Sequence, residues 1–201
     1  MKKIGVAAVL LGFVFALAPA MRAQDLNHAE FGAFAEYFKA HQTNTNFGGV
    51  GGRLSVNAGK YFQVEGEISY DFTAAYNQTF FRPGIGGTTT TTLVRSDYRV
   101  LHGLFGPKIQ MGGPVKLFVT LKGGFDDFMF DPRAPSFATF TSSVDNLGSN
   151  GTSTHPALYP GGGAEVFLGP IGLRLDVGDE IFWAGGARNN LKVTFGPTIR
   201  F

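Results

Sequence analysis

The 201-residue chain contains no cysteine, so it can form neither a disulfide nor a thiolate metal site. Small exported domains often depend on disulfides for stability, and this chain must be stabilised in another way. After residue 24 it also has no apolar run near the ~20 residues that a transmembrane helix needs. Any membrane insertion of that part must therefore use β-strands.

The first 23 residues have the three parts of a secretion signal. Lys2 and Lys3 form a positive n-region, residues 4–18 form an apolar h-region, and Ala23 supplies a small residue for cleavage. We predict a signal peptide over 1–23, with mature chain from Gln24. An uncleaved membrane anchor is the weaker interpretation, because the apolar stretch is short for a span.

The remaining residues, 24–201, suit a single domain. Formal net charge is +2 for the whole chain, and losing Lys2, Lys3 and Arg22 with the signal makes it about −1. The basic isoelectric point therefore does not indicate a nucleic-acid partner. Glycine (29 residues) and phenylalanine (21 residues) are abundant. Glycine suits tight turns and closely packed barrel walls, and phenylalanine suits contact with lipid.

The clearest strand signal lies between Phe62 and Phe72, where apolar residues alternate with polar ones, three of them acidic. A period of two is typical of a β-strand. Ten steps at ~3.3 Å, tilted by ~40°, rise about 25 Å, which is the height of the apolar band on outer-membrane barrels. The acids Glu65 and Glu67 then face either water or a polar lumen.

Similar alternation predicts eight strands joined by alternating short and long connections. Short connections at one end and long connections at the other are typical of a bacterial up-and-down barrel, in which the short turns face the periplasm. Residues 88–92 and 141–154 are expected in long outer loops. The expected strands are 29–39, 47–57, 62–72, 94–110, 115–124, 157–168, 171–182 and 190–201.

The last expected strand is apolar on one face and polar on the other, and it ends in an aromatic residue. It resembles the closing strand of outer-membrane barrels, whose assembly machinery recognises such a terminal aromatic. Pro197 departs from this pattern because proline lacks a ladder donor, so we expect it beyond the end of pairing or at a bulge. The residues of the predicted assembly signal are Leu191, Val193, Phe195, Ile199 and Phe201.

The whole layout resembles the OmpA-like family of eight-stranded bacterial outer-membrane barrels. The resemblance rests on the signal peptide, residues 62–72, the Gly106-Pro107-Lys108 step and residues 191–201. It implies an all-β, eight-stranded antiparallel up-and-down transmembrane barrel over 24–201, located in the cell outer membrane. It also implies outer-membrane lipids, periplasmic chaperones and the barrel assembly machinery as partners, and a monomer.

Charged residues on the polar faces of the expected strands are candidates for the lumen. An eight-stranded barrel has an interior only wide enough for side chains, so we expect them to pair across it and fill it. In the irregular fourth strand we place Arg99 inward and His102 toward lipid. The predicted lumen charge network is Arg53, Glu65, Glu67, Arg99, Lys122, Arg174, Asp176, Lys192 and Arg200.

These patterns predict an envelope structural protein, or one that binds an extracellular ligand through its loops. The alternative is a narrow channel for small solutes. A lipid A-modifying enzyme is a further alternative, although no catalytic triad is evident in the sequence. Asp126, Asp127, Asp131 and His155 could bind a metal at the outer rim, but solvated loop acids explain them better. We therefore expect no enzyme activity, cofactor or metal.

Overall fold

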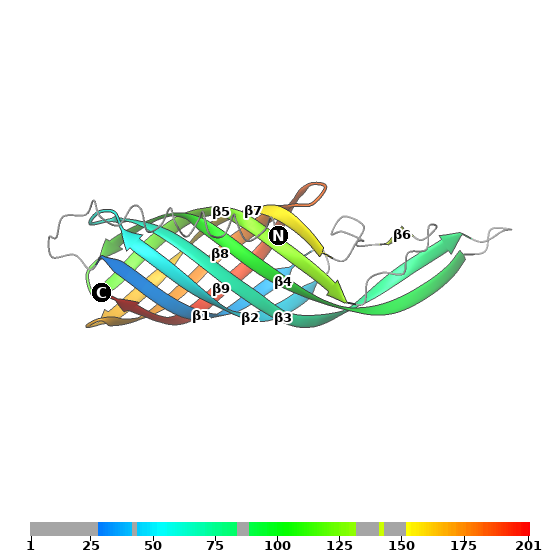
Figure 1. The fold of residues 1–201 in the computed structure, drawn as a ribbon, viewed down its shortest axis with the longest axis horizontal. Helices are drawn as coiled ribbons and strands as arrows, with labels where there is room; N and C mark the ends of the chain where they lie inside the picture. The colour runs from blue at the N-terminus through cyan, green and yellow to red at the C-terminus, as the bar shows by residue number, and fades with distance from the viewer. Residues whose placement is uncertain (1–27, 42–43, 84–88, 132–140, 143–151) are drawn as a thin grey trace, which may run out of the picture.

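The computed structural model describes residues 28–41, 44–83, 89–131, 141–142 and 152–201. Side chains are described within these ranges except at 75–96, 130–131, 141–142 and 152–153. The predicted signal peptide lies outside the described residues. The eight long strands wind around one axis as a single barrel, and the short strand β6 (Thr141–Ser142) lies apart from it, near a projecting hairpin (Figure 1).

Eight long antiparallel strands form a closed sheet in which each pairs with its sequence neighbour along the barrel. The sheet closes because the first strand, β1, also pairs with the last strand, β9. The two-residue strand β6 pairs with the end of β3, at Phe80 and Phe81, along the edge that does not pair with β4. The strands are β1 (Ala29–Ala40), β2 (Thr45–Asn57), β3 (Phe62–Pro83), β4 (Thr89–Gly112), β5 (Val115–Asp131), β6 (Thr141–Ser142), β7 (Thr152–Leu168), β8 (Ile171–Trp183) and β9 (Ala187–Arg200).

The two-residue period of the sequence becomes an inside and an outside. In β1, every second residue from Glu30 to Ala40 is buried, while most residues between them are exposed. Polar residues of the third expected strand lie inside, and its apolar residues lie outside. The exposed outer side chains include Phe31, Val50, Leu54, Ile68, Phe105, Ile109, Leu117, Val119, Leu121, Leu173, Leu175, Val177, Phe195 and Ile199.

This outer surface is an apolar belt around the barrel. Soluble monomers rarely expose contiguous apolar patches beyond a few hundred Å². Because the belt alternates with buried polar groups along the same strands, the pattern is that of a barrel in lipid. Among the described residues no α-helix is long and apolar enough to cross a membrane.

One end of the barrel, here the turn end, carries three short connections. Residues 58–61, 113–114 and 169–170 join β2 to β3, β4 to β5 and β7 to β8. Gly112 and Gly169 have φ of 127° and 66°, a region that glycine adopts without strain. His28 and Phe201 also meet here, since the His28 N–H donates to the Phe201 carbonyl at 2.8 Å.

The opposite end, the loop end, differs from the expectation of long loops throughout. Residues 41–44 join β1 to β2, and residues 184–186 join β8 to β9. Both connections are short because these four strands extend further than expected. The β3–β4 hairpin continues to Pro83 and Thr89 and projects beyond the other strands (Figure 1). The threonines at 89–92 therefore belong to β4 and not to a loop; residues 84–88, 132–140 and 143–151 lie outside the described part.

Prolines inside the strands are accommodated without leaving the ladder, contrary to the expectation for Pro197. Pro197 pairs with Leu173 of β8, while the ladder to β1 is interrupted between the Gly32–Thr198 and Ala35–Phe195 pairs and keeps its register. Pro107 and Pro160 show the same one-sided interruption. Each proline thus gives up bonding on one side only, because it lacks an N–H.

The fourth expected strand has the opposite phase from the one predicted. Directly paired residues of neighbouring strands share a face, and β3 sets Ser69 opposite His102. Because Ser69 is inside, His102 is inside and Arg99 is outside. The pairing of these two strands is irregular at one point, in β3, where the register against β4 shifts between Asp71 and Ala74. The prediction for β4 was wrong because Arg99 was placed inward for its charge.

Inward glycines make room for the rings in the lumen. A Cβ built on Gly51 would lie 2.4 Å from the Phe34 ring, and one on Gly178 would lie 2.5 Å from the Tyr159 ring. These distances are far below van der Waals contact, so no larger residue fits without moving the rings. The abundance of glycine is therefore explained partly by the narrow interior.

Closure can be tested by cross-linking, since the chain has no cysteine of its own. Ala35 and Phe195 are paired partners on β1 and β9. We expect Ala35→Cys/Phe195→Cys to form an intramolecular disulfide on mild oxidation, detected by mass spectrometry of the non-reduced protein. Ala35→Cys/Phe105→Cys, with its second site on β4, is the control and should remain reduced. Absence of the first cross-link in folded protein would mean an open sheet.

Candidate functional site: the charged interior

The interior of the barrel is densely charged. Nine carboxylates, five lysines or arginines and His102 are buried there among the described residues. They divide into two regions, a main network toward the turn end and a smaller cluster around His102. The buried charges are Glu30, Glu36, Glu65, Glu67, Asp71, Asp126, Glu165, Asp176, Glu180, Arg53, Lys108, Lys122, Arg174, Lys192 and His102.

Glu65 is the centre of the main network. Its carboxylate accepts two bonds from Arg174, at 2.5 and 2.9 Å, and its Oε1 lies 2.7 Å from the Lys122 Nζ. Ser55 donates a further bond at 2.7 Å. Two-pronged binding of this kind by arginine is among the stronger charge-assisted interactions in proteins. Glu65 is on β3, Lys122 on β5 and Arg174 on β8, so the contacts cross the lumen.

Further contacts extend this network around the wall. Arg174 also donates to Asp176 at 2.7 Å and lies 3.1 Å from Glu165. Lys122 reaches Glu67 at 2.5 Å, and Lys108 reaches Glu165 at 2.6 Å. The result is a connected network in which each described buried charge has an oppositely charged neighbour, which is the condition for burying ions at an acceptable free energy.

Aromatic rings cover the cations of the network. The guanidinium carbon of Arg53 lies 4.2 Å from the centre of the Phe34 ring, and that of Arg174 lies 4.2 Å from the Phe118 ring. Cation–π contacts of this kind are worth more where water is excluded. The rings therefore fill space and also stabilise charge.

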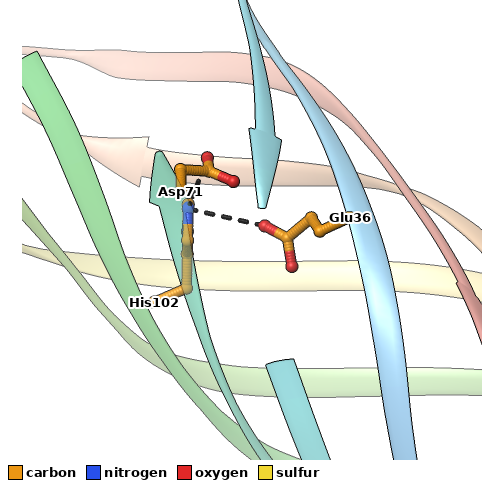
Figure 2. A group of neighbouring side chains, drawn as sticks. All are labelled: Glu36, Asp71 and His102. Atoms are coloured by element: carbon orange, nitrogen blue, oxygen red, sulfur yellow. Dashed lines mark hydrogen bonds and ion pairs between the residues drawn. The ribbon is translucent and has the colours of Figure 1, made fainter. Parts of the chain in front are cut away.

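His102 lies at the centre of the second region, the His102 cluster. Its Nε2 lies 3.1 Å from Asp71 Oδ2 and 3.6 Å from Glu36 Oε1 (Figure 2). Its Nδ1 lies 2.5 Å from Glu180 Oε1 and 3.0 Å from Asp126 Oδ1. Lys192 approaches two of these acids, with its Nζ 2.8 Å from Glu180 and 3.3 Å from Glu36. The acids come from β1, β3, β5 and β8, and His102 comes from β4.

An aromatic layer lies between this cluster and the loop end. The Phe38 ring centre is 4.9 Å from that of His102, and the Phe47 and Tyr98 rings are 4.6 Å apart. The layer consists of buried residues with apolar or aromatic side chains. Its rings are Phe38, Phe47, Tyr98, Phe128 and Phe182.

The described lysines of the interior are shielded from water. Lys108, Lys122 and Lys192 each have 0% of their surface exposed. A lysine lining a water-filled channel would be solvated, because its ammonium is costly to dehydrate. Chemically, the arrangement can hold a sealed polar core together and can hold protons or a small cation at His102.

Seven of the nine residues predicted for the lumen network lie inside it, and two do not. Arg99 is partly exposed on the outer side of β4. Arg200 lies at the turn end, where its Nε donates to the Gly169 carbonyl at 3.0 Å and its guanidinium covers the Phe167 ring. The seven inside are Arg53, Glu65, Glu67, Lys122, Arg174, Asp176 and Lys192.

The expected network omitted several buried ions. Asp126 was predicted at a solvated outer rim, but β5 continues to Asp131 and carries it into the lumen beside His102. His102 was missed because the phase of β4 was reversed. Glu36 was expected to point inward, and Asp71 and Glu165 lie on the polar faces of their expected strands, but all three were left out of the predicted charge network. The alternation of their strands is the signal that could have added them. The other buried ions that the predicted network left out are Glu30, Lys108 and Glu180.

No known protein family matches this sequence, and no curated protein matches it. Solved structures do match the fold. Neisserial surface protein A, from Neisseria, aligns with a TM-score of 0.53 at 9% identity over 87% of this chain and 96% of that chain. This likeness shows the fold alone, which is that of the eight-stranded outer-membrane barrels.

Two further structures align at lower scores. Ail, the attachment invasion locus protein of Yersinia pestis, has a TM-score of 0.48 at 16% identity, covering 87% of this chain and 97% of that one. The outer membrane protein OprG of Pseudomonas aeruginosa has a TM-score of 0.49 at 11% identity, covering 88% and 96%.

The network predicts strong coupling between Glu65 and Arg174. Arg174→Met should lower the free energy of unfolding by about 3–5 kcal/mol, because it leaves buried carboxylates unpaired. Adding Glu65→Gln to that variant should lower it by much less than Glu65→Gln does alone. Urea unfolding of the refolded barrel in lipid vesicles measures all three. Arg200→Met at the rim is the control, with an effect below about 1 kcal/mol; additive effects at 65 and 174 would contradict the network.

Proposed function

We propose that this chain is an integral outer-membrane β-barrel with a sealed polar interior, acting as an envelope structural protein or through surface contacts at its loop end. The observation that carries the proposal is the sorting of side chains: an apolar belt outside and a paired, dehydrated ion network inside. Such sorting is unstable in water and stable in lipid.

The interior supports a non-conducting barrel over the channel alternative. Large side chains from across the wall, among them Arg174, Tyr159 and Phe38, are less than 2% exposed. Solute passage would require many charge pairs to separate at once. The same burial disfavours the enzyme alternative at His102, because a lipid substrate cannot reach a ring that lies under the aromatic layer.

The loop end supports the surface-contact part of the proposal. The β3–β4 hairpin projects beyond the barrel (Figure 1). The β3 edge of this hairpin can pair with a further strand, as β6 does at Phe80 and Phe81. An extracellular ligand is therefore proposed to bind this hairpin. We also propose that periplasmic chaperones carry the unfolded chain to the barrel assembly machinery. That machinery would recognise the alternating residues at the end of the chain, which are Leu191, Val193, Phe195, Ile199 and Phe201.

Planar-bilayer recording tests the sealed interior. We expect no stable single-channel steps from the purified, folded barrel. As a matched control, the Lys122→Ala/Arg174→Ala variant removes two large cations from the lumen, so it should leak more than wild type if it folds. Regular conductance steps in wild-type protein would support the channel alternative in place of this proposal.

Lipid contact is tested by placing a charge at two heights on the outside. Leu175 is half-exposed in the belt and Leu168 lies at the turn end. Leu175→Arg should lower the free energy of unfolding in lipid vesicles by about 2–4 kcal/mol, and Leu168→Arg by about 0–1 kcal/mol, because the penalty falls toward the membrane interface. Equal effects at both sites, measured by urea titration, would contradict a membrane-embedded belt.

A further inference from the structure

The strongest unexplained feature of the interior is a surplus of negative charge at the His102 cluster. In the main network, the five carboxylates of Glu30, Glu65, Glu67, Glu165 and Asp176 are shared among four buried cations. Around His102, the carboxylates of Glu36, Asp71, Asp126 and Glu180 have Lys192 as the single buried lysine or arginine in contact among the described residues. A buried surplus of this size must be compensated.

The two sides of the His102 ring differ in geometry. On the Nδ1 side, Glu180 Oε1 and Asp126 Oδ1 both lie within hydrogen-bond distance of the ring nitrogen, at 2.5 and 3.0 Å. An Nδ1–H donated to Glu180 and Asp126 leaves the lone pair of a neutral imidazole on Nε2. Nε2 also forms a hydrogen bond with Asp71 Oδ2 at 3.1 Å. A bound metal ion would replace the Nε2 proton and contact that lone pair together with the oxygens of Asp71 and Glu36.

The Nε2 side has the spacing of metal ligands. At metal–ligand distances of about 2.1 Å, two ligand atoms are about 3.0 Å apart at a right angle and about 3.4 Å apart at a tetrahedral angle. The Nε2 distances to Asp71 and Glu36 are 3.1 and 3.6 Å. All three ligand atoms lie within 4.8 Å of one another (Figure 2).

Buried acceptors without hydrogen bonds are an independent observation that points to a bound cation. Neither carboxylate oxygen of Glu36 accepts a hydrogen bond in the described part, and neither does Asp71 Oδ1. Lys192 Nζ lies 3.3 Å from Glu36 Oε2 as an ion pair, which leaves Oε1, the oxygen nearer His102, and Asp71 Oδ1 without a donor. The Glu36 side chain is 0% exposed and aims at Nε2 (Figure 2). Buried carboxylate oxygens that accept no hydrogen bond are costly unless a cation contacts them.

We propose that Glu36, Asp71 and His102 Nε2 bind one divalent first-row transition-metal ion inside the barrel. One imidazole and two carboxylates suit zinc, manganese or iron. Glu180 and Asp126 act from the other side of the ring by fixing the tautomer, as carboxylates do behind metal-bound histidines. The ion joins β1, β3 and β4 directly and, through the Nδ1 bonds, β5 and β8.

Metal content after refolding tests the proposal. Because the cluster is buried, the mature chain is refolded into detergent with Zn²⁺ or Mn²⁺ and then passed over a chelating resin. We expect about one ion per chain by elemental mass spectrometry. Glu36→Gln/Asp71→Asn should bind at least tenfold more weakly, and Glu180→Gln about 10–100-fold more weakly, as expected for loss of an outer partner.

Two controls keep the result decisive. His28→Ala removes an exposed histidine and should retain the ion. The Glu36→Gln/Asp71→Asn variant removes two buried charges of the surplus sign, so it should still fold. X-ray absorption of zinc-loaded wild-type protein should show a single imidazole ligand. Absence of retained metal in wild type, equal retention in the double variant, or a site with no imidazole or with two would overturn the proposal.

Discussion

The pairing of buried charges across the lumen is the constraint on which the rest of the structure depends. Ions such as Glu65 and Arg174 can be buried only if each finds its partners on other strands. Those partners meet only if the sheet closes with the observed register, so closure and charge pairing require each other. Gly51 and Gly178 lie against the Phe34 and Tyr159 rings and leave room for these rings to fill the space between the ions.

The outer face follows from the same constraint. Because the polar half of each strand is used inside, the apolar half faces outward, and lipid is the medium that stabilises this exterior. The same alternation of polar and apolar residues thus gives an ionic core and an apolar surface, which is the reverse of the arrangement in a soluble protein. The His102 cluster is the place where internal pairing is incomplete, and it is therefore where an additional cation has a role.

Much of this architecture was predictable from the sequence, for a physical reason. Strand periodicity is local, so residues 62–72 and 171–182 reveal their faces without knowledge of their neighbours. The turn-end boundaries were predicted closely because glycine and proline mark them. The phase of β4 was not predictable in this way, since it depends on the register with β3. The loop-end strand lengths and the meeting of Asp126 with His102 depend on long-range pairing too.

Water access to the lumen lysines tests the central claim most directly. The folded wild-type barrel in detergent is treated with a small water-soluble amine-acylating reagent, and each lysine is quantified by peptide mass spectrometry. Lys60, which is exposed at the turn end, should react readily. Lys108, Lys122 and Lys192 should stay protected until denaturant unfolds the chain. Modification of Lys122 at a rate close to that of Lys60 in the folded barrel would contradict a sealed, ion-paired interior.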